Sequence, residues 1–446
     1  MKTRPNVAAQ QRSPQVGERG LLVTSTRTRM RPLIPVGRLT AVSLFLTLGL
    51  LVGAVTEAMA QTTPWAVIKC KFSDQPQEPS FDPLFITGPY GMAGYWLEVS
   101  YGKIRLDGST VYPANGGWYT LPFTLAQAMT MTRIQRINAC IAAATDVDAS
   151  QFFSVIAIVN VAIDSGAAGG KVLLDPLAWN VSFAGHEMGH VYSGSPHSFD
   201  DTQTVYCPGY QPGEYGDGWD IMSAMTFGGS NPTFQGLFGT SGPGLNAPNL
   251  NRLGWLPANR ILTWNGGSQT TLLAALNHPE AAGYFMAKVP FDSGNPNHYY
   301  TVEFRRKTGW DQGIPRDTVL IHEIRADGVS SGLSYLIRAG GGAERLTDQT
   351  FRDVNNNLAI TVLNLDANSS TATVNIGHNE VWVDFAYGGL FEFGTFGLPY
   401  NTLVEGVDAV AYNGTLRIKA GSRNETATIS KKMTIAAFGG PVTIGR

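Results

Sequence analysis

The spacing of hydrophobic residues predicts an α/β arrangement in the first part of the chain. Residues 65–72 (WAVIKCKF) alternate in character and predict an opening strand. Helix-forming residues dominate 125–144, where three isoleucines share one stripe, so we expect a packed helix there. The β-branched run 152–163 (FFSVIAIVNVAI) predicts a central buried strand, and a second helix is expected around His186. This order of helix, strand and helix indicates an α/β fold.

From residue 265 onward the pattern changes to short strands separated by Gly, Asn and Asp. Alternating hydrophobic and polar residues bounded by turn-forming residues are typical of antiparallel sheets. The pattern predicts an antiparallel, sandwich-like β domain over residues 265–380. Its expected strands begin at Thr301, Thr318, Ala359 and Thr371.

A third module is predicted over residues 381–446, with strands expected at 414–421, 427–430, 433–436 and 439–445. This rhythm is typical of the first one or two coils of a right-handed parallel β-helix. Such a solenoid needs about three stacked repeats to bury a core, so the visible part looks truncated. The expected fold is therefore an α/β (α+β) domain over residues 61–264, an antiparallel β domain, and a partial parallel β-helix-like tail.

The first 60 residues have the features of an export signal. Four arginines between residues 27 and 38 precede an uncharged apolar stretch, 39–55, which ends near Ala58-Met59-Ala60. A small-x-small sequence after an apolar run is typical of a signal-peptide cleavage site. We therefore expect a signal peptide over 1–60, a mature chain that begins at Gln61, and a secreted protein with no stable membrane span. The alternative is a membrane anchor, for which 39–55 is at the short limit.

The amino-acid composition narrows the class of protein further. Charged residues make up 15% and aromatic residues 10% of the 446 positions, and there are 51 glycines, which suits an extracellular, loop-rich protein that contains β-structure. Basic residues are concentrated in the first 60 positions, so the rest is more acidic than the formal net charge of −2 suggests. The chain has no basic run, which argues against nucleic acid as a partner. Cys70, Cys140 and Cys207 allow one disulfide and one free thiol, in three alternative pairings.

The residues that carry chemistry are His186, Glu187 and His190, in the pattern H-E-x-x-H. In a helix, residues four apart lie on one face, so both imidazoles can reach one ion while Glu187 lies beside it. Neutral imidazole nitrogens bind Zn²⁺ well, and a site with three protein ligands leaves a position open for water. Zinc acidifies that water, and a carboxylate can accept its proton as it attacks a carbonyl group. A helix with two structural histidines is the alternative.

The wider segment 186–198 (HEMGHVYSGSPHS) resembles the zinc signature H-E-x-x-H-x-x-G-x-x-H of metzincin metalloproteases, especially gametolysin-type peptidases. Residues 214–223 (EYGDGWDIMS) resemble the Met-turn of that family, which implies that Met222 lies beneath the metal as a hydrophobic floor. Supporting matches at 95–102, 245–255 and 302–311 are similar to the immune inhibitor A group as well, and the resemblance covers about residues 65–380.

The resemblance implies His197 as the third zinc ligand, but the spacing departs from the family by one residue. Gly194 comes four residues after His190 where three is usual, although the step from Gly194 to His197 is kept. Gly194 can adopt left-handed backbone angles easily, which would let the chain turn back, and Pro196 fixes the approach of His197. The alternatives for the third position are the carboxylates of Asp200, Asp201 and Glu214.

Some acidic residues and one further histidine also have side chains of the kinds that contact metals. The acidic residues between 200 and 220 could bind calcium, although they match no regular loop spacing; they are Asp200, Asp201, Asp217 and Asp220. His322, a lone histidine inside an alternating strand, is expected to be structural.

These observations favour a secreted zinc-dependent endopeptidase that hydrolyses peptide bonds of protein or peptide substrates. The expected zinc ligands are His186, His190 and His197, with Glu187 as general base. One alternative is a surface adhesin or glycan-binding protein on a metalloprotease-like scaffold, which the tail supports because β-helices present extended binding surfaces. Another is a zinc-dependent hydrolase that acts on a bond other than a peptide bond.

Overall fold

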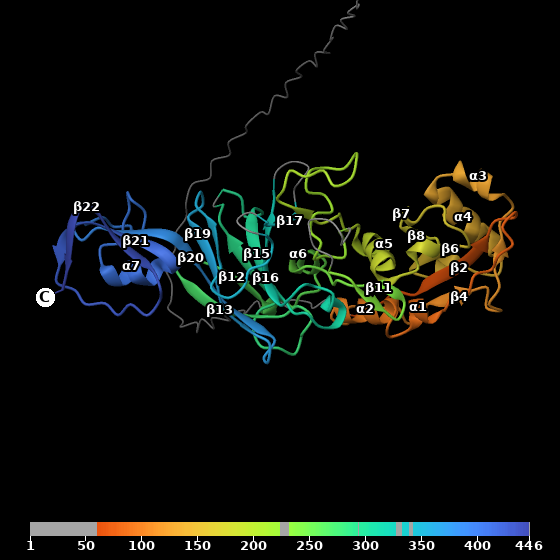
Figure 1. The fold of residues 1–446 in the computed structure, drawn as a ribbon, viewed down its shortest axis with the longest axis horizontal. Coiled ribbons are helices and arrows are strands. Elements are labelled where there is room, and N and C mark those ends of the chain that lie inside the picture. Colours follow the sequence, from red (N-terminus) through yellow and green to blue (C-terminus); the bar gives the residue numbers. More distant parts are fainter. Residues whose placement is uncertain (1–59, 224–231, 293, 327–331, 339–341, 446) are drawn as a thin grey trace, which may run out of the picture. The chain divides into compact units, whose positions relative to one another are not determined.

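The computed structural model describes residues 60–223, 232–292, 294–326, 332–338 and 342–445. The chain is mixed α/β with more strand than helix, arranged in several sheets (Figure 1). The signal peptide predicted over 1–60 lies outside the described residues, apart from its last position. Within the described part of the chain, every helix falls short of the length and apolar character that crossing a bilayer requires.

The first half is built on a sheet whose central strands are buried on both faces. The strand order is β4-β2-β6-β8-β7, with β5 paired to β2, and every pair is parallel except β7–β8. Alternate residues of β2 and β6 belong to two separate hydrophobic clusters, one on each side of the sheet. The bounds are β2 (Trp65–Lys71), β4 (Thr110–Tyr112), β5 (Tyr119–Thr120), β6 (Ser154–Val159), β7 (Gly166–Ala168) and β8 (Lys171–Leu174).

Helices cover both faces of this sheet. Hydrophobic residues of α2 (Met92–Val99) and α5 (Val181–Ser193) lie in one cluster, and those of α4 (Arg133–Ala143) lie in the other. The single helix predicted over 125–144 is wrong, because the structure has α3 (Leu125–Met129) and then α4. Thr132 is the N-cap of the second helix and forms a capping box with Gln135. In this motif, the side chain of each residue accepts a hydrogen bond from the backbone N–H of the other.

A disulfide joins the sheet to α4. It links Cys70 of β2 to Cys140 of α4, and Cys207 is a free thiol. This pairing resolves the three alternatives that the sequence left open. Because the bond closes a loop of 70 residues, it restricts the unfolded chain considerably.

The second half begins with two packed sheets, as the alternating pattern predicts. The first has the order β12-β14-β15-β16-β17-β9, and β14 to β17 pair in antiparallel fashion. In the second, β13, β18, β19 and β20 pair in antiparallel fashion, and both sheets contribute to one hydrophobic cluster. The bounds are β9 (Phe199–Asp200), β12 (Ile261–Thr263), β13 (Gln269–Ala274), β14 (Met286–Pro290), β15 (Tyr299–Arg305), β16 (Thr318–Ile324), β17 (Ser334–Leu336), β18 (Thr350–Asp353), β19 (Leu358–Asp366) and β20 (Thr371–Val383).

The C-terminal module continues the second sheet with parallel strands. β20 pairs with β21 (Val410–Arg423), which pairs with β22 (Thr434–Ile444), and α7 (Leu403–Ala409) packs on them. The strand expected at 427–430 is absent, and those expected at 433–436 and 439–445 form one long strand, β22. β20 itself spans the boundary predicted at 380/381, so the β domain and the module share a sheet.

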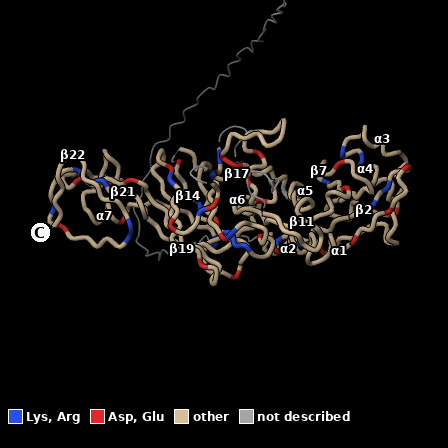
Figure 2. Tube along the Cα trace, in the orientation of Figure 1, with Lys and Arg blue, Asp and Glu red and all other residues tan. Residues whose placement is uncertain are grey.

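Short elements complete the described chain. They are β1 (Gln61–Thr62), α1 (Leu84–Thr87), β3 (Ile104–Arg105), β10 (Phe234–Gly236), β11 (Gly239–Ser241) and α6 (Ala247–Arg252). Figure 2 shows basic and acidic residues interspersed along the described chain.

Candidate metal centre

The site is built on α5, whose two ends are defined by local sequence. The side chain of Asn180 accepts a hydrogen bond from the N–H of Phe183 and caps the first turn. Val181, Ala184 and Met188 face the hydrophobic core, which turns the opposite face of the helix toward a cleft. The helix ends at Gly194, which adopts left-handed angles (φ 56°, ψ 36°) and donates its N–H to the carbonyl of His190. The turn expected at Gly194 is therefore present.

His186 and His190 are held with their Nε2 atoms facing each other. Nδ1 of His186 lies 2.8 Å from the carbonyl oxygen of Ile221, and Nδ1 of His190 lies 2.7 Å from that of Ser195. A carbonyl oxygen can only accept, so each Nδ1 carries a hydrogen and each Nε2 presents a lone pair. These two Nε2 atoms are 3.1 Å apart. Two lone pairs at that distance repel each other unless a positive ion lies between them, and the distance suits two ligands of one zinc ion.

His197 brings a third imidazole to the same place. One ligand atom from each of the three histidines lies within 4.8 Å of the others, and among the described residues this is the group that could hold a metal. The loop after α5 is tied down by Arg252, whose guanidinium donates to the Ser195 hydroxyl over 2.7 Å. The extra residue before Gly194 therefore does not misdirect His197.

The carboxylates considered as alternative ligands have other partners. Glu214 Oε1 lies 2.6 Å from Nδ1 of His197, so it orients this histidine. Asp200 accepts from Tyr206 and forms an ion pair with Arg338, whose backbone N–H donates to Asp201. These carboxylates lie outside the histidine group in the described structure.

Glu187 lies beside the histidines at the wall of an open cleft of about 640 Å³. Its Oε2 accepts a hydrogen bond of 2.6 Å from the N–H of Ala167 on β7, the edge strand of the sheet. Burial raises the pKa of this carboxyl group, although His190 and the Ala167 N–H oppose the shift. Burial also lowers the pKa of His186 and of His190 to about 4, so both imidazoles are neutral near pH 7, the form that binds metals.

Met222 lies beneath the helix. It is fully buried, and its sulfur contacts Gly189 so closely that a Cβ there would overlap it. Asp220 holds the Met222 segment in place, because its Oδ1 accepts from the Met222 N–H at 2.6 Å and its Oδ2 accepts from the Asn246 N–H at 2.6 Å. The carbonyl of Ile221 that orients His186 therefore belongs to a rigid turn.

Two buried side chains of the β domain hold this turn in place. His322 of β16 is fully buried, and its Nε2 lies 3.1 Å from Oδ2 of Asp217. Arg305 of β15, also fully buried, donates to the carbonyl of Trp219 over 2.9 Å. Burial alone would lower the pKa of His322, but Asp217 and Glu303 more than offset it, so this pKa lies above its usual value. His322 is structural, as expected, and it connects the two halves of the chain.

Tyr215 is a site residue that the sequence reasoning missed. Its hydroxyl lies 2.9 Å from Nε2 of His197, and the two rings pack with centroids 4.0 Å apart. Tyr215 has a positive φ of 68°, a conformation that costs energy in a residue other than glycine and often marks a functional position. The one feature of the sequence that could have marked Tyr215 as a site residue is its position directly after Glu214 in the segment 214–223.

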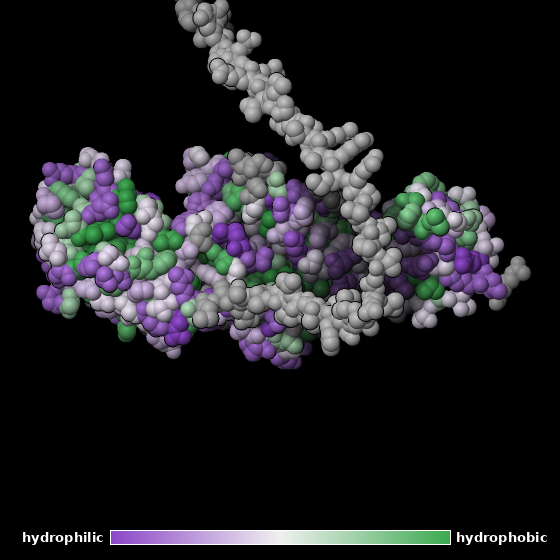
Figure 3. All heavy atoms as spheres, turned by 180° about the vertical axis from the view of Figure 1, so that it is seen from behind, coloured by the Kyte–Doolittle hydropathy of each residue, from purple (hydrophilic) through white to green (hydrophobic). Residues whose placement is uncertain are grey.

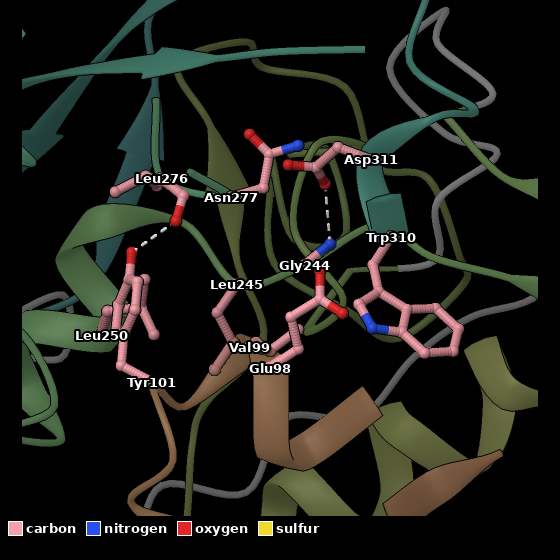
Figure 4. Close-up of a pocket in the computed structure, with 10 residues that line it drawn as sticks. All are labelled: Glu98, Val99, Tyr101, Gly244, Leu245, Leu250, Leu276, Asn277, Trp310 and Asp311. Atoms are coloured by element: carbon pink, nitrogen blue, oxygen red, sulfur yellow. Dashed lines mark hydrogen bonds between the residues drawn. The ribbon is translucent and has the colours of Figure 1, made fainter. Parts of the chain in front are cut away.

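A smaller cavity lies where the two halves of the chain pack (Figure 4). It encloses about 30 Å³, which admits about one water molecule. The Tyr101 hydroxyl donates to the carbonyl of Leu276 over 2.7 Å, and the Gly244 N–H donates to Asp311 over 2.9 Å. This cavity is too small for a substrate, whereas the cleft beside the histidines holds about 640 Å³.

Comparison with known proteins adds little. Neither a family model nor a curated protein sequence matches the chain. Among solved structures it is similar to the crystal structure of wild-type OgpA from Akkermansia muciniphila, with 14% sequence identity and a TM-score of 0.30. The match covers 73% of this chain and 96% of that chain. A likeness of this size carries no argument about activity, which rests on the residues described above.

Proposed function

We propose that this protein is a secreted, zinc-dependent endopeptidase of the metzincin type. The observation that carries the proposal is the pair of unprotonated Nε2 atoms of His186 and His190, 3.1 Å apart, with His197 as the third imidazole. His186 and His190 would hold the ion through Nε2, and His197 would do so through Nε2 while its Nδ1–H stays on Glu214. Bound zinc would supply a Lewis acid that polarises a carbonyl group and acidifies water.

Two residues of the chain would act on the water and on the substrate. Glu187 accepts the proton of the attacking water and then passes it to the leaving amine, which is the role of a general base that becomes a general acid. Burial of Glu187 suits this role, because it makes the carboxylate a better proton acceptor. The Tyr215 hydroxyl, which lies beside His197, donates a hydrogen bond to the oxyanion that forms on the substrate.

A peptide substrate suits the wall of the cleft. The edge strand β7 lines it, and the edge of a sheet is where an extended chain can bind alongside a strand. The cleft of about 640 Å³ is open, which suits cleavage within a chain. Export is supported by the disulfide between Cys70 and Cys140, since such bonds persist in oxidising compartments outside the cytosol.

The test is turnover of an unfolded protein substrate by the purified chain. Activity should be lost on treatment with a chelator and return on addition of zinc. Glu187→Gln should keep the metal and lower turnover about 10²-fold or more, because the amide cannot accept a proton. Near-normal activity in this variant, or activity that survives complete metal removal, would contradict the proposal.

A further inference from the structure

The C-terminal module exposes an unusual group of aromatic side chains. In the parallel register of β20, β21 and β22, Trp382 lies opposite Arg417, and Lys419 lies opposite Phe438. The sequence neighbours of Trp382 and Arg417 are buried on the other face of the sheet; they are Val381, Val383, Leu416 and Ile418. Lys419 lies over the ring of Phe396 and Phe438 packs on Trp382, so these side chains share the outer face with Trp382 and Arg417. Figure 3 shows hydrophobic side chains (green) at the surface of this module, at the right of that view.

Three rings form the centre of this face. The centroid of Trp382 lies 4.9 Å from that of Phe396 and 5.0 Å from that of Phe438, and the two phenylalanines are 5.8 Å apart. Phe396 is 54% and Phe438 is 44% exposed, so large parts of both rings face solvent. We call Trp382, Phe396 and Phe438 the aromatic face. Exposed aromatic groups gathered in one place mark a binding surface more often than chance exposure does.

The aromatic face is bordered by charged groups that are already paired. Glu380 accepts from the indole N–H of Trp382 over 2.9 Å and forms an ion pair with Arg417. On the other side, Lys419 lies 3.3 Å from Asp384 and 4.5 Å from the centre of the Phe396 ring. The border therefore offers both hydrogen-bond donors and acceptors, with no excess of either charge.

The paired charges around the aromatic face favour a sugar over a membrane or a protein as its partner. An anionic membrane attracts surfaces with unpaired cations, whereas Arg417 and Lys419 are each neutralised by a carboxylate. A protein that covered the face would have to remove both ion pairs from water at a large cost. A sugar meets neither difficulty, since its C–H face packs on an aromatic ring while its hydroxyl groups bond to the bordering charges.

We propose that the aromatic face binds neutral glycan chains. It would hold the protein on a polysaccharide or on glycosylated material and leave the cleft beside the histidines free. The proposal does not depend on the metal centre, because none of its residues contributes to the cleft.

The test is binding of the full chain to an array of neutral glycans and to insoluble polysaccharides such as cellulose and chitin. The wild type should bind, with little change between low and high salt because the interaction is not ionic. Phe396→Ala and Phe438→Ala should each weaken binding roughly tenfold through loss of a stacked ring. Both positions are exposed, so the variants should fold normally. Tyr90→Ala, which removes a ring 67% exposed in the first half of the chain, is the matched control and should bind like the wild type.

Three results would overturn the proposal. One is that the wild type is retained by none of the glycans. Another is that Phe396→Ala and Phe438→Ala bind as well as Tyr90→Ala does. The third is that the aromatic face instead mediates binding to phosphatidylserine vesicles, or self-association in sedimentation, which the same two variants abolish.

Discussion

The buried pair of His322 and Asp217 should contribute strongly to stability, and His322→Gln tests this. The glutamine amide can still donate a hydrogen bond but carries no charge, so it leaves a fully buried carboxylate without its cation. Breaking a buried ion pair by removing one partner costs about 3–5 kcal/mol. The matched control is His298→Gln. His298 pairs with Glu323 over 2.8 Å, but its side chain is 29% exposed, so this loss should stay below about 1 kcal/mol.

The stability of the protein should also depend on pH because of the His322–Asp217 pair. The pKa of His322 is raised, so its contribution is fully present below the unfolded value of about 6.5 and is lost as pH rises through the folded pKa. Burial alone would raise the pKa of Asp217, but His322, together with the Asn246 side chain and the Trp219 N–H, more than offsets it, so this pKa is lowered. Its contribution is therefore present above about 3.9 and is lost as pH falls through the folded pKa. The wild type should lose stability as the pH rises above about 6.5, and His322→Gln should lose less.

Urea unfolding, followed by fluorescence at several pH values, measures both effects as free energies of unfolding. The reasoning is refuted if His322→Gln is as stable as His298→Gln at pH 6. It is equally refuted if the two variants share one pH profile. In either case the β domain would not brace the Met222 turn through this pair.

Three further predictions follow from the site and its support. Glu214→Gln should weaken zinc affinity about 10–100-fold, measured by competition with a chromophoric chelator, because the orienting carboxylate on His197 is lost. Tyr215→Phe should lower kcat while zinc affinity stays the same, as steady-state kinetics and the same competition assay will show. Replacing Cys70 and Cys140 by serine should lower the free energy of unfolding by about 4 kcal/mol for a closed loop of 70 residues, whereas Cys207→Ser should change it little.

Much of the site could be predicted because its residues are close in sequence. The spacing of His186 and His190 places both on one helix face, and Gly194 permits the turn that returns His197. The alternation of hydrophobic residues likewise predicts the strands of the β domain, which depend on local pattern. The single helix predicted over 125–144 was wrong, because the prediction overlooked Thr132 and Gln135, a capping-box pair that marks the start of a second helix.

What sequence could not predict depends on distant contacts. His322 and Asp217 are 105 residues apart, and nothing in either local pattern identifies the other as its partner. The contact of Tyr215 with His197 likewise depends on how two loops fold over the cleft. In the C-terminal module, small residues permitted several strand boundaries, and pairing with β21 selected one continuous strand.

A crystal structure of the purified chain, with diffraction measured on both sides of the zinc absorption edge, would show directly whether the three histidines hold zinc. We expect one anomalous peak per chain, about 2.0–2.1 Å from a ring nitrogen of each of His186, His190 and His197. The peak should be lost in His190→Ala. A metal at another position, or no peak in protein that cleaves unfolded substrate, would rule out a catalytic zinc on these histidines.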